Sequence, residues 1–148
     1  MAVADNILII INTRHHRYYN YYEAFTIAWV ARRFYNVKKV TIMYGPYGVW
    51  MTKKGSLAGI KITPEAKKLV ASRFEGLKAE KLPDHLEQLA RFEKEKMGIS
   101  IVSCATYHVL EGFAKEIEDT SNIEDFIDPI DVREGCKLLL EADKILYY

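Results

Sequence analysis

Five consecutive aliphatic residues, Ile7-Leu8-Ile9-Ile10-Ile11, stand near the start of the chain. A continuous aliphatic run of this length is typical of a strand that is covered on both faces in a parallel sheet. After the polar loop 12–20, apolar residues recur at helical spacing from Tyr22 to Phe34. A second run, Lys39–Tyr44, ends at the turn residues Gly45-Pro46-Tyr47-Gly48. The sequence therefore predicts a strand, a helix and a second strand in a βαβ connection.

The rest of the chain continues this alternation. We expect a long loop from Val49 to Ile62, followed by a helix with Thr63 as N-cap and Pro64 at its first position. A second helix is expected from an Asp84–Glu87 capping box to Gly98, before a strand Ile99–Ser103. The remaining expected segments are a helix Tyr107–Ile117, a short strand within Asn122–Ile127, a helix Val132–Ala142 and a strand Lys144–Tyr148. Alternating strands and helices predict a three-layer α/β/α fold with an open, mostly parallel sheet of about five strands. We expect one domain, residues 1–148.

Composition excludes several classes of protein. The chain has 148 residues, of which 49% are hydrophobic and 28% charged, as in an ordinary globular domain. Its formal net charge of +1 gives no general electrostatic reason to bind nucleic acid. The aliphatic run is far shorter than the roughly 20 residues of a membrane helix, and no targeting leader frames it. We therefore expect a cytoplasmic protein that binds neither nucleic acid nor membrane.

Ligands of open α/β sheets bind outside the carboxyl ends of the strands. The loops that follow the three clearest predicted strands are rich in reactive and aromatic side chains. We expect Cys104 to be the catalytic residue, and we expect a substrate pocket lined by His15, His16, Tyr47, Trp50, Thr106, Tyr107 and His108.

Cys104 directly follows a predicted strand and precedes a predicted helix. Backbone N–H groups and the positive end of a helix dipole favour the thiolate, which is the nucleophilic form. His108, His15 or His16 could lower the thiol pKa further. A buried cysteine that only fills space is the alternative, because unpaired cysteines are among the most buried residues. Cys136 lies among apolar residues of a predicted helix, and we expect it to pack there.

The sequence contains no motif for nucleotide binding, for a catalytic triad or for a metal site. Neither a Walker A loop nor a Gly-x-Gly-x-x-Gly motif follows the first strand, and no Ser-His-Asp order or catalytic carboxylate pair can be argued. The adjacent His15 and His16 would point apart in an extended loop, without further ligands spaced to complete a metal site. We expect no metal and no cofactor.

In order, the segments resemble the DsrE/DsrF-like family, the sulfur-relay group that includes the Tus sulfur carriers. The resemblance rests on Glu23-Ala24, Gly48-Val49, Leu86–Met97 with Gly98-Ile99, the strand meeting Cys104, Gly112, and Glu141–Leu146. It implies a flavodoxin-related α/β subunit of a homo- or hetero-oligomer, and we expect a homo-oligomer, a trimer or a hexamer. It also implies that Cys104 receives sulfur as a persulfide or thiosulfonate. Many relatives carry a second Cys or an Arg-Gly pair after this cysteine, where this chain has Tyr107 and Glu111-Gly112.

Three functional hypotheses follow. The first is a cytoplasmic sulfur carrier or sulfurtransferase that uses Cys104, with sulfur donor and acceptor proteins or small sulfur compounds as partners. The second is a non-catalytic module on the same fold that binds a small molecule or a protein, with Cys104 as an inert pocket wall. The third is a structural subunit of a larger assembly. It draws on surface tyrosines and on uneven charge, because residues 1–60 carry 8 Lys/Arg and 2 Asp/Glu whereas residues 111–148 carry 4 and 11.

Overall fold

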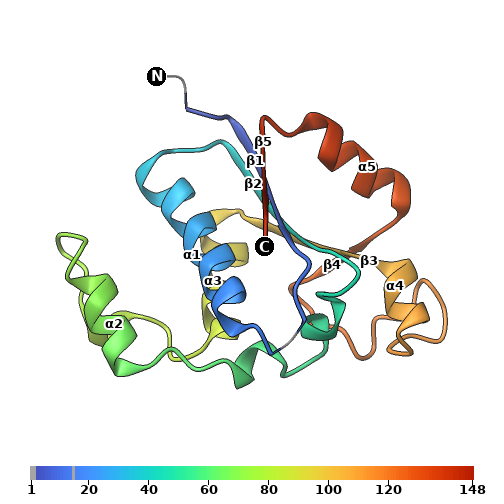
Figure 1. Cartoon of the computed structure of the whole chain (residues 1–148), viewed down its shortest axis with the longest axis horizontal. Coiled ribbons are helices and arrows are strands. Elements are labelled where there is room, and N and C mark those ends of the chain that lie inside the picture. Colours follow the sequence, from blue (N-terminus) through green and yellow to red (C-terminus); the bar gives the residue numbers. More distant parts are fainter. Residues whose placement is uncertain (1–2, 15) are drawn as a thin grey trace.

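The computed structural model describes residues 3–14 and 16–148, which form an α/β structure built on one sheet (Figure 1). The strands are β1 (Asn6–Ile11), β2 (Lys39–Tyr44), β3 (Ser100–Cys104), β4 (Asp128–Ile130) and β5 (Lys144–Tyr147). The α-helices are α1 (Tyr18–Phe34), α2 (Pro64–Ala71), α3 (Leu86–Met97), α4 (Ala105–Leu110) and α5 (Val132–Glu141). Three short 3-10 helices are η1 (Val49–Thr52), η2 (Leu57–Gly59) and η3 (Ala79–Lys81). No helix in this part of the chain is long and apolar enough to cross a membrane.

All strand pairs are parallel, and the strand order is β4-β3-β2-β1-β5. The chain moves outward through β2, β3 and β4, and then returns across the sheet to place β5 beside β1. Because βαβ crossovers are right-handed, a reversal of direction puts the returning helix on the opposite face. Accordingly, α1 and α3 cover one face and α5 lies on the other (Figure 1). The predicted α/β fold with a five-stranded parallel sheet is confirmed.

Most of the core lies between the sheet and the pair α1 and α3. Alternate strand residues point to this side. Fully buried side chains from the strands and the two helices meet here: Ile9, Ile11, Ile42, Ile101, Phe25, Ala28, Leu86 and Ala90. Each large aliphatic or aromatic side chain buried in this way contributes about 1.5–3 kcal/mol of transfer free energy. This layer therefore supplies most of the hydrophobic stabilisation.

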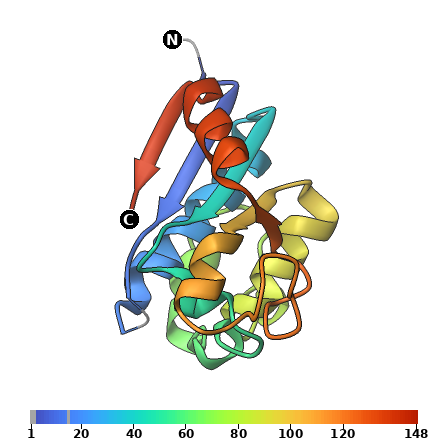
Figure 2. The ribbon, with the colours of Figure 1, turned by 90° about the vertical axis from the view of Figure 1, so that its right-hand side faces the viewer.

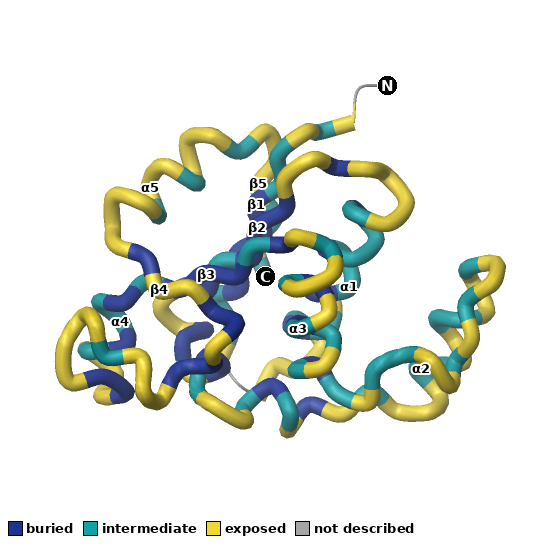
Figure 3. The backbone as a smooth tube through the Cα atoms, turned by 180° about the vertical axis from the view of Figure 1, so that it is seen from behind, coloured by how far each residue is buried: buried dark blue, intermediate teal, exposed yellow. Residues whose placement is uncertain are grey.

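The opposite face is covered less completely. Leu8, Ile10 and Val102 are buried there, but no residue of α5 is buried. The tube in Figure 3 is exposed along nearly all of α5, and Figure 2 looks onto this side of the sheet. Cys136, which we expected to pack, is exposed. That prediction is wrong because α5 does not press any of its residues into the core.

Local capping signals mostly hold, with one shift. Thr63 caps α2, with its hydroxyl accepting a hydrogen bond from the backbone N–H of Ala66 at 3.1 Å, and Gly98 ends α3 in a left-handed conformation. The N-cap of α3, however, is His85 and not Asp84. The Asp84 carboxylate instead pairs with Lys67 of α2, a contact that sequence spacing does not indicate.

Two predicted elements after β3 are wrong in extent. The helix expected over Tyr107–Ile117 begins at Ala105 and ends at Leu110. The chain turns away at Gly112, whose φ of +81° suits glycine, and Phe113 is buried beyond the turn. The short strand considered for residues 122–127 is a loop that pairs with Lys53 in one isolated bridge at Ile123. The fourth strand follows it, as β4.

Glu93 on α3 carries a carboxyl group that is buried within the main core. Its residue exposure is 0%, and neither carboxylate oxygen has a hydrogen-bond partner among the described residues. Burial raises its pKa well above the ordinary value, which favours the protonated form. The buried hydroxyl of Tyr44 also lacks a partner, and Glu93 is one of the groups that raise the pKa of Tyr44. An unpaired buried carboxyl is a cost to stability.

Replacing Glu93 with Met is expected to stabilise the fold by about 1–3 kcal/mol at neutral pH, because it removes an unpaired polar group at similar volume. The folded-state pKa of Glu93 is raised, so wild-type stability falls as pH rises from about 4.5 toward that pKa. The gain from Glu93→Met should therefore be larger at pH 8 than at pH 5, as measured by urea unfolding. A pH-independent difference or a less stable variant would contradict this account.

Candidate functional site

The carboxyl ends of the three central strands lie at one edge of the sheet. Ile11 pairs with Tyr44, and Tyr44 pairs with Ser103, at the last matched positions of β1, β2 and β3. The next residues along the three strands are Asn12, Gly45 and Cys104. The loops that the sequence singled out therefore leave the sheet at the same level. This edge is the candidate site.

Asn12 fastens the loop after β1 to the loop after β2 and to β5. Its Oδ1 accepts a hydrogen bond from the backbone N–H of Tyr47 at 2.9 Å, and its Nδ2 donates to the hydroxyl of Tyr147 at 2.5 Å. Its own backbone N–H donates to the carbonyl of Tyr148 at 2.7 Å. Asn12 was not among the residues predicted for the site. The signal available in the sequence was an amide side chain placed directly after a buried strand.

The two glycines of the turn after β2 are required by this close approach. A Cβ at Gly45 would lie 2.6 Å from Oδ1 of Asn12, and a Cβ at Gly48 would lie 2.3 Å from the carbonyl oxygen of Ile11. Any side chain at Gly48 would therefore collide with backbone. The turn after β2 packs directly against the end of β1, which leaves both loops little freedom to move.

The predicted pocket residues divide between two places on this edge. Tyr47 is exposed, and its ring lies 5.5 Å from the guanidinium carbon of Arg14. His16 lines a polar hollow at the start of α1 together with Asn12, Thr13, Arg14, Arg17 and Asn20. His15 lies outside the described residues. This part of the edge thus brings cationic side chains together with Tyr47.

Trp50 faces the segment that follows α4. Its Nε1 donates to Oε2 of Glu111 at 2.9 Å, and its ring meets Phe113 edge-on with centroids 4.7 Å apart. The ammonium of Lys53 lies 5.1 Å from the Trp50 ring centroid. Glu111 was not predicted for the site, since nothing in the sequence links it to a residue 61 positions away.

The loop after Trp50 is also tied down. The N–H of Lys54 donates to the carbonyl of Asn122, and the N–H of Glu124 donates to the carbonyl of Thr52, both at 2.9 Å. Val49, Leu57 and Ile60 from the same stretch are buried in the core. Residues 49–62 are therefore packed against the core beside the carboxyl ends of the strands.

Cys104 is the last residue of β3 and the N-cap of α4. It is a free cysteine of intermediate exposure, and its side chain makes no capping hydrogen bond. Ser103 precedes it on the strand and therefore points to the other face of the sheet. The residue as a whole is partly exposed and is not fully buried in the core.

His108 is placed differently from the prediction. Its imidazole is buried, and its Nε2 lies 2.7 Å from the hydroxyl oxygen of Ser103. Burial lowers its pKa, which favours the neutral ring. Its backbone carbonyl accepts hydrogen bonds from Phe113 and Ala114. In this arrangement His108 anchors α4 to β3, and its ring is engaged with Ser103 rather than with Cys104.

The other two residues predicted from this loop lie on α4. Thr106 and Tyr107 are both half-buried, and Tyr107 packs against the main core. The polar hollow at the start of α1 is lined by other residues of this edge and not by Cys104. Within residues 3–14 and 16–148, no group of three His, Cys, Asp or Glu side chains is arranged to hold a metal ion.

The fold defines an α/β protein with an open, five-stranded parallel sheet. A solved structure with a similar fold is the crystal structure of the YchN protein from E. coli, with a TM-score of 0.64 over 97% of this chain and 99% of that chain. The two sequences are 14% identical, so the likeness concerns the fold. No protein-family model and no curated protein matched the sequence.

Replacing Asn12 with Ala is expected to destabilise the protein by about 1–2 kcal/mol, because this edge loses two side-chain hydrogen bonds that join three segments. Tyr147→Phe is the matched control, since it removes only the hydroxyl partner and leaves the bond to Tyr47. Chemical unfolding of the three proteins should rank them wild type, Tyr147→Phe, Asn12→Ala. Equal stability of Asn12→Ala and wild type would show that the linkage is unimportant.

Proposed function

We propose that the protein is a cytoplasmic sulfur carrier, related to sulfurtransferases, that holds sulfur on Cys104 and passes it to the thiol of a partner. The observation that carries the proposal is a free cysteine of intermediate exposure at the carboxyl end of a central strand, in a fold similar to that of the YchN protein. The partial exposure of Cys104 supports the proposal, because a cysteine that only fills space is usually fully buried.

The transfer needs no cofactor. The Cys104 thiolate attacks the outer sulfur of a donor persulfide, the donor S–S bond breaks, and the donor leaves as a thiolate. Cys104 then carries the persulfide. A partner thiolate attacks the outer sulfur in turn, which regenerates the Cys104 thiolate. With tetrathionate, the Cys104 thiolate attacks an inner sulfur, the central S–S bond breaks and thiosulfate leaves, so that Cys104 carries a thiosulfonate.

The surroundings of Cys104 support such a role in two ways. The neighbouring loops are held by Asn12 and by the glycine turn, so the edge is preorganised and a partner meets a fixed surface. Arg14 and Arg17 follow β1, which is separated from β3 by β2, and they place positive charge on the same edge of the sheet, where an anionic sulfur donor would approach. His108 is assigned a structural part in this proposal, because its ring is committed to Ser103.

Loading of sulfur should require Cys104. Intact mass of the reduced protein, measured before and after exposure to a persulfide donor or tetrathionate, should show an adduct that reductant removes. Cys104→Ser should abolish the adduct and Cys136→Ser should leave it. Cys136 is an informative control because it is the more exposed of the two cysteine residues. An adduct that forms only on Cys104 would therefore reflect the environment of that thiol and not its accessibility alone.

An adduct that persists in Cys104→Ser would contradict the assignment of Cys104 as the residue that carries sulfur. If wild-type Cys104 stays unmodified under excess donor and alkylates more slowly than Cys136, the protein is a non-catalytic binding module on the same fold. One observation favours this second function: the polar hollow at the start of α1 lies at the same edge of the sheet and is not lined by Cys104.

We also propose that the protein forms a homo-oligomer, a trimer or a hexamer, through the face that carries α5. Leu140 is 81% exposed, and Ile145 and Tyr147 of the edge strand β5 are 46% and 66% exposed. An edge strand with uncovered apolar side chains is a ready surface for association. A second copy on this face would bury what α5 leaves open.

Leu140→Glu is expected to shift the protein to monomers, because it places a charge in the apolar contact. Leu69→Glu is the matched control, since Leu69 is 65% exposed on α2, on the other side of the sheet. Size-exclusion chromatography with light scattering measures the mass of each. A monomeric wild type at all concentrations, or an unchanged mass for Leu140→Glu, would rule out this interface.

A further inference from the structure

The segments that follow β1 and β2 give one half of the candidate edge a positive charge. Residues 12–17 and 45–61 contain five Lys or Arg and no Asp or Glu. Both segments leave the carboxyl ends of their strands, and β2 lies directly beside β3, which ends at Cys104. We call these two segments the basic half of the edge. It is therefore next to the cysteine in the order of the strands.

The positive charges of the basic half are not neutralised by carboxylates. Among the described residues, Arg14, Arg17 and Lys53 form no ion pair. The guanidinium carbon of Arg14 lies 5.5 Å from the centroid of the Tyr47 ring, and the ammonium of Lys53 lies 5.1 Å from that of Trp50. A cation over an aromatic ring keeps its charge and its N–H donors. These groups therefore remain able to bind an anionic partner.

The same surface exposes aromatic side chains. Tyr18, Tyr47 and Trp50 are 51%, 57% and 43% exposed. Tyr18 and Trp50 line one open hollow together with Lys53 and Lys54, and none of the described residues that line this hollow is Asp or Glu. Tyr, Trp and Arg are enriched where proteins bind one another, and they contribute much of the binding free energy. The basic half thus has the composition of a protein-binding surface.

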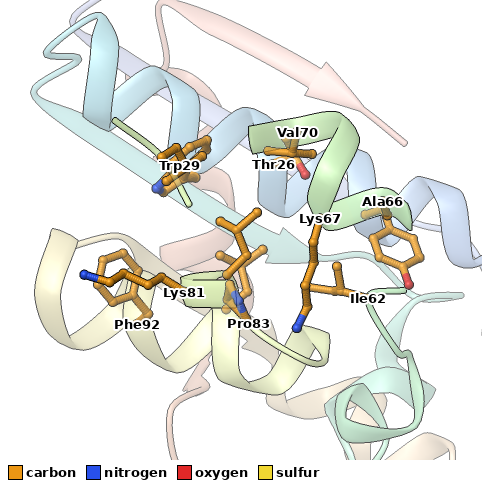
Figure 4. Close-up of a pocket in the computed structure, with 13 residues that line it drawn as sticks. Thr26, Trp29, Ile62, Ala66, Lys67, Val70, Lys81, Pro83 and Phe92 are labelled. Carbon is orange, nitrogen blue, oxygen red and sulfur yellow. The ribbon is translucent and has the colours of Figure 1, made fainter. Parts of the chain in front are cut away.

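The apolar pocket under α2 is a separate feature. It has a volume of about 220 Å³ and is lined by residues of α1, of α3 and of the chain from Ile62 to Pro83. Its two lysines, Lys67 and Lys81, point apart and do not converge on one group (Figure 4). None of its described lining residues belongs to the basic half. The pocket therefore adds nothing to the charge of the edge.

A segment of opposite charge borders the basic half. Residues 111–125, which follow α4, contain six Asp or Glu and one Lys. They meet the basic half where Trp50 bonds to Glu111 and where Lys53 pairs with Ile123. A long polyanion such as a nucleic acid, laid across both segments, would be repelled by the acidic one. A protein can present acidic groups to the basic half alone, which favours a protein as the partner.

We propose that the basic half of the edge binds an acidic segment of the protein that exchanges sulfur with Cys104, so that the identity of this partner rests on the proposed function. Asp and Glu side chains of the segment lie against Arg14, Arg17 and Lys53. An apolar side chain of the segment enters the hollow that Tyr18 and Trp50 line. Opposite charges also speed the encounter, because they steer the acidic segment toward this edge.

Peptide probes test the charge of the partner. A fluorescein-labelled peptide of about ten residues, rich in Glu and with one Leu, should bind the wild-type protein in fluorescence anisotropy, whereas its analogue with Lys at each Glu position should not. Binding of the acidic peptide should weaken as NaCl rises from about 50 to 300 mM, because salt screens exposed charges. Cys104→Ser should bind the acidic peptide as the wild type does, so docking and sulfur loading can fail independently.

Two charge substitutions locate the binding surface. Arg14→Gln and Lys53→Gln should each weaken binding of the acidic peptide by about two- to fivefold, because each removes one exposed charge contact. Lys96→Gln is the matched control and should leave the affinity unchanged. Lys96 is an exposed lysine in the last turn of α3, which leads into the start of β3 at the opposite edge of the sheet. Circular dichroism and light scattering give the fold and the mass of each variant.

Equal binding of the acidic peptide and its lysine analogue would overturn the proposal. So would an affinity for the acidic peptide that neither Arg14→Gln nor Lys53→Gln lowers. Tighter binding of an oligouridine of about ten nucleotides would assign the surface to nucleic acid instead. If Arg14→Gln lowers the mass of the assembly and the acidic peptide does not bind, a second copy of the chain covers this surface, and the proposal is wrong.

Discussion

Hydrogen bonding of β1 to β2 on one side and to β5 on the other unites the start, the middle and the end of the chain in one sheet. Every other feature is placed relative to this strand. Asn12, the residue that follows it, bonds to both neighbours, and the Gly45–Gly48 turn fits only because it approaches the end of β1 without side chains. The edge where Cys104 lies is stiff as a result. In the proposed function, this stiffness would let Cys104 meet a partner with little reorganisation.

The two faces of the sheet differ in how completely they are covered. The α1 and α3 face holds the main core, and it also tolerates Glu93, an unpaired carboxyl whose burial is a stability cost. The α5 face is thinly covered and leaves apolar side chains in solvent. Proteins retain such arrangements where function or assembly compensates for the lost stability. The fold therefore separates a rigid layer from a surface available for contact.

Much of the fold could be predicted from the sequence, because its signals are local. The Ile7–Ile11 run is a buried parallel strand, Thr63 caps α2, and Gly98 ends α3. The errors arose where distant residues intervene. Lys67 draws the carboxylate of Asp84 into an ion pair, and the chain leaves α4 early to bring Phe113 under Trp50. No periodicity within a helix can reveal either contact.

The candidate site shows the same division. The sequence by itself determined that Cys104, Tyr47 and the residues after β1 would meet at one edge, because parallel strands end together. Only the tertiary structure decided that His108 turns to Ser103, that Cys136 is exposed and that a pocket lies under α2. These outcomes depend on how segments far apart in the chain pack, and packing is a property of shape in three dimensions. The local preferences of residues do not specify this packing.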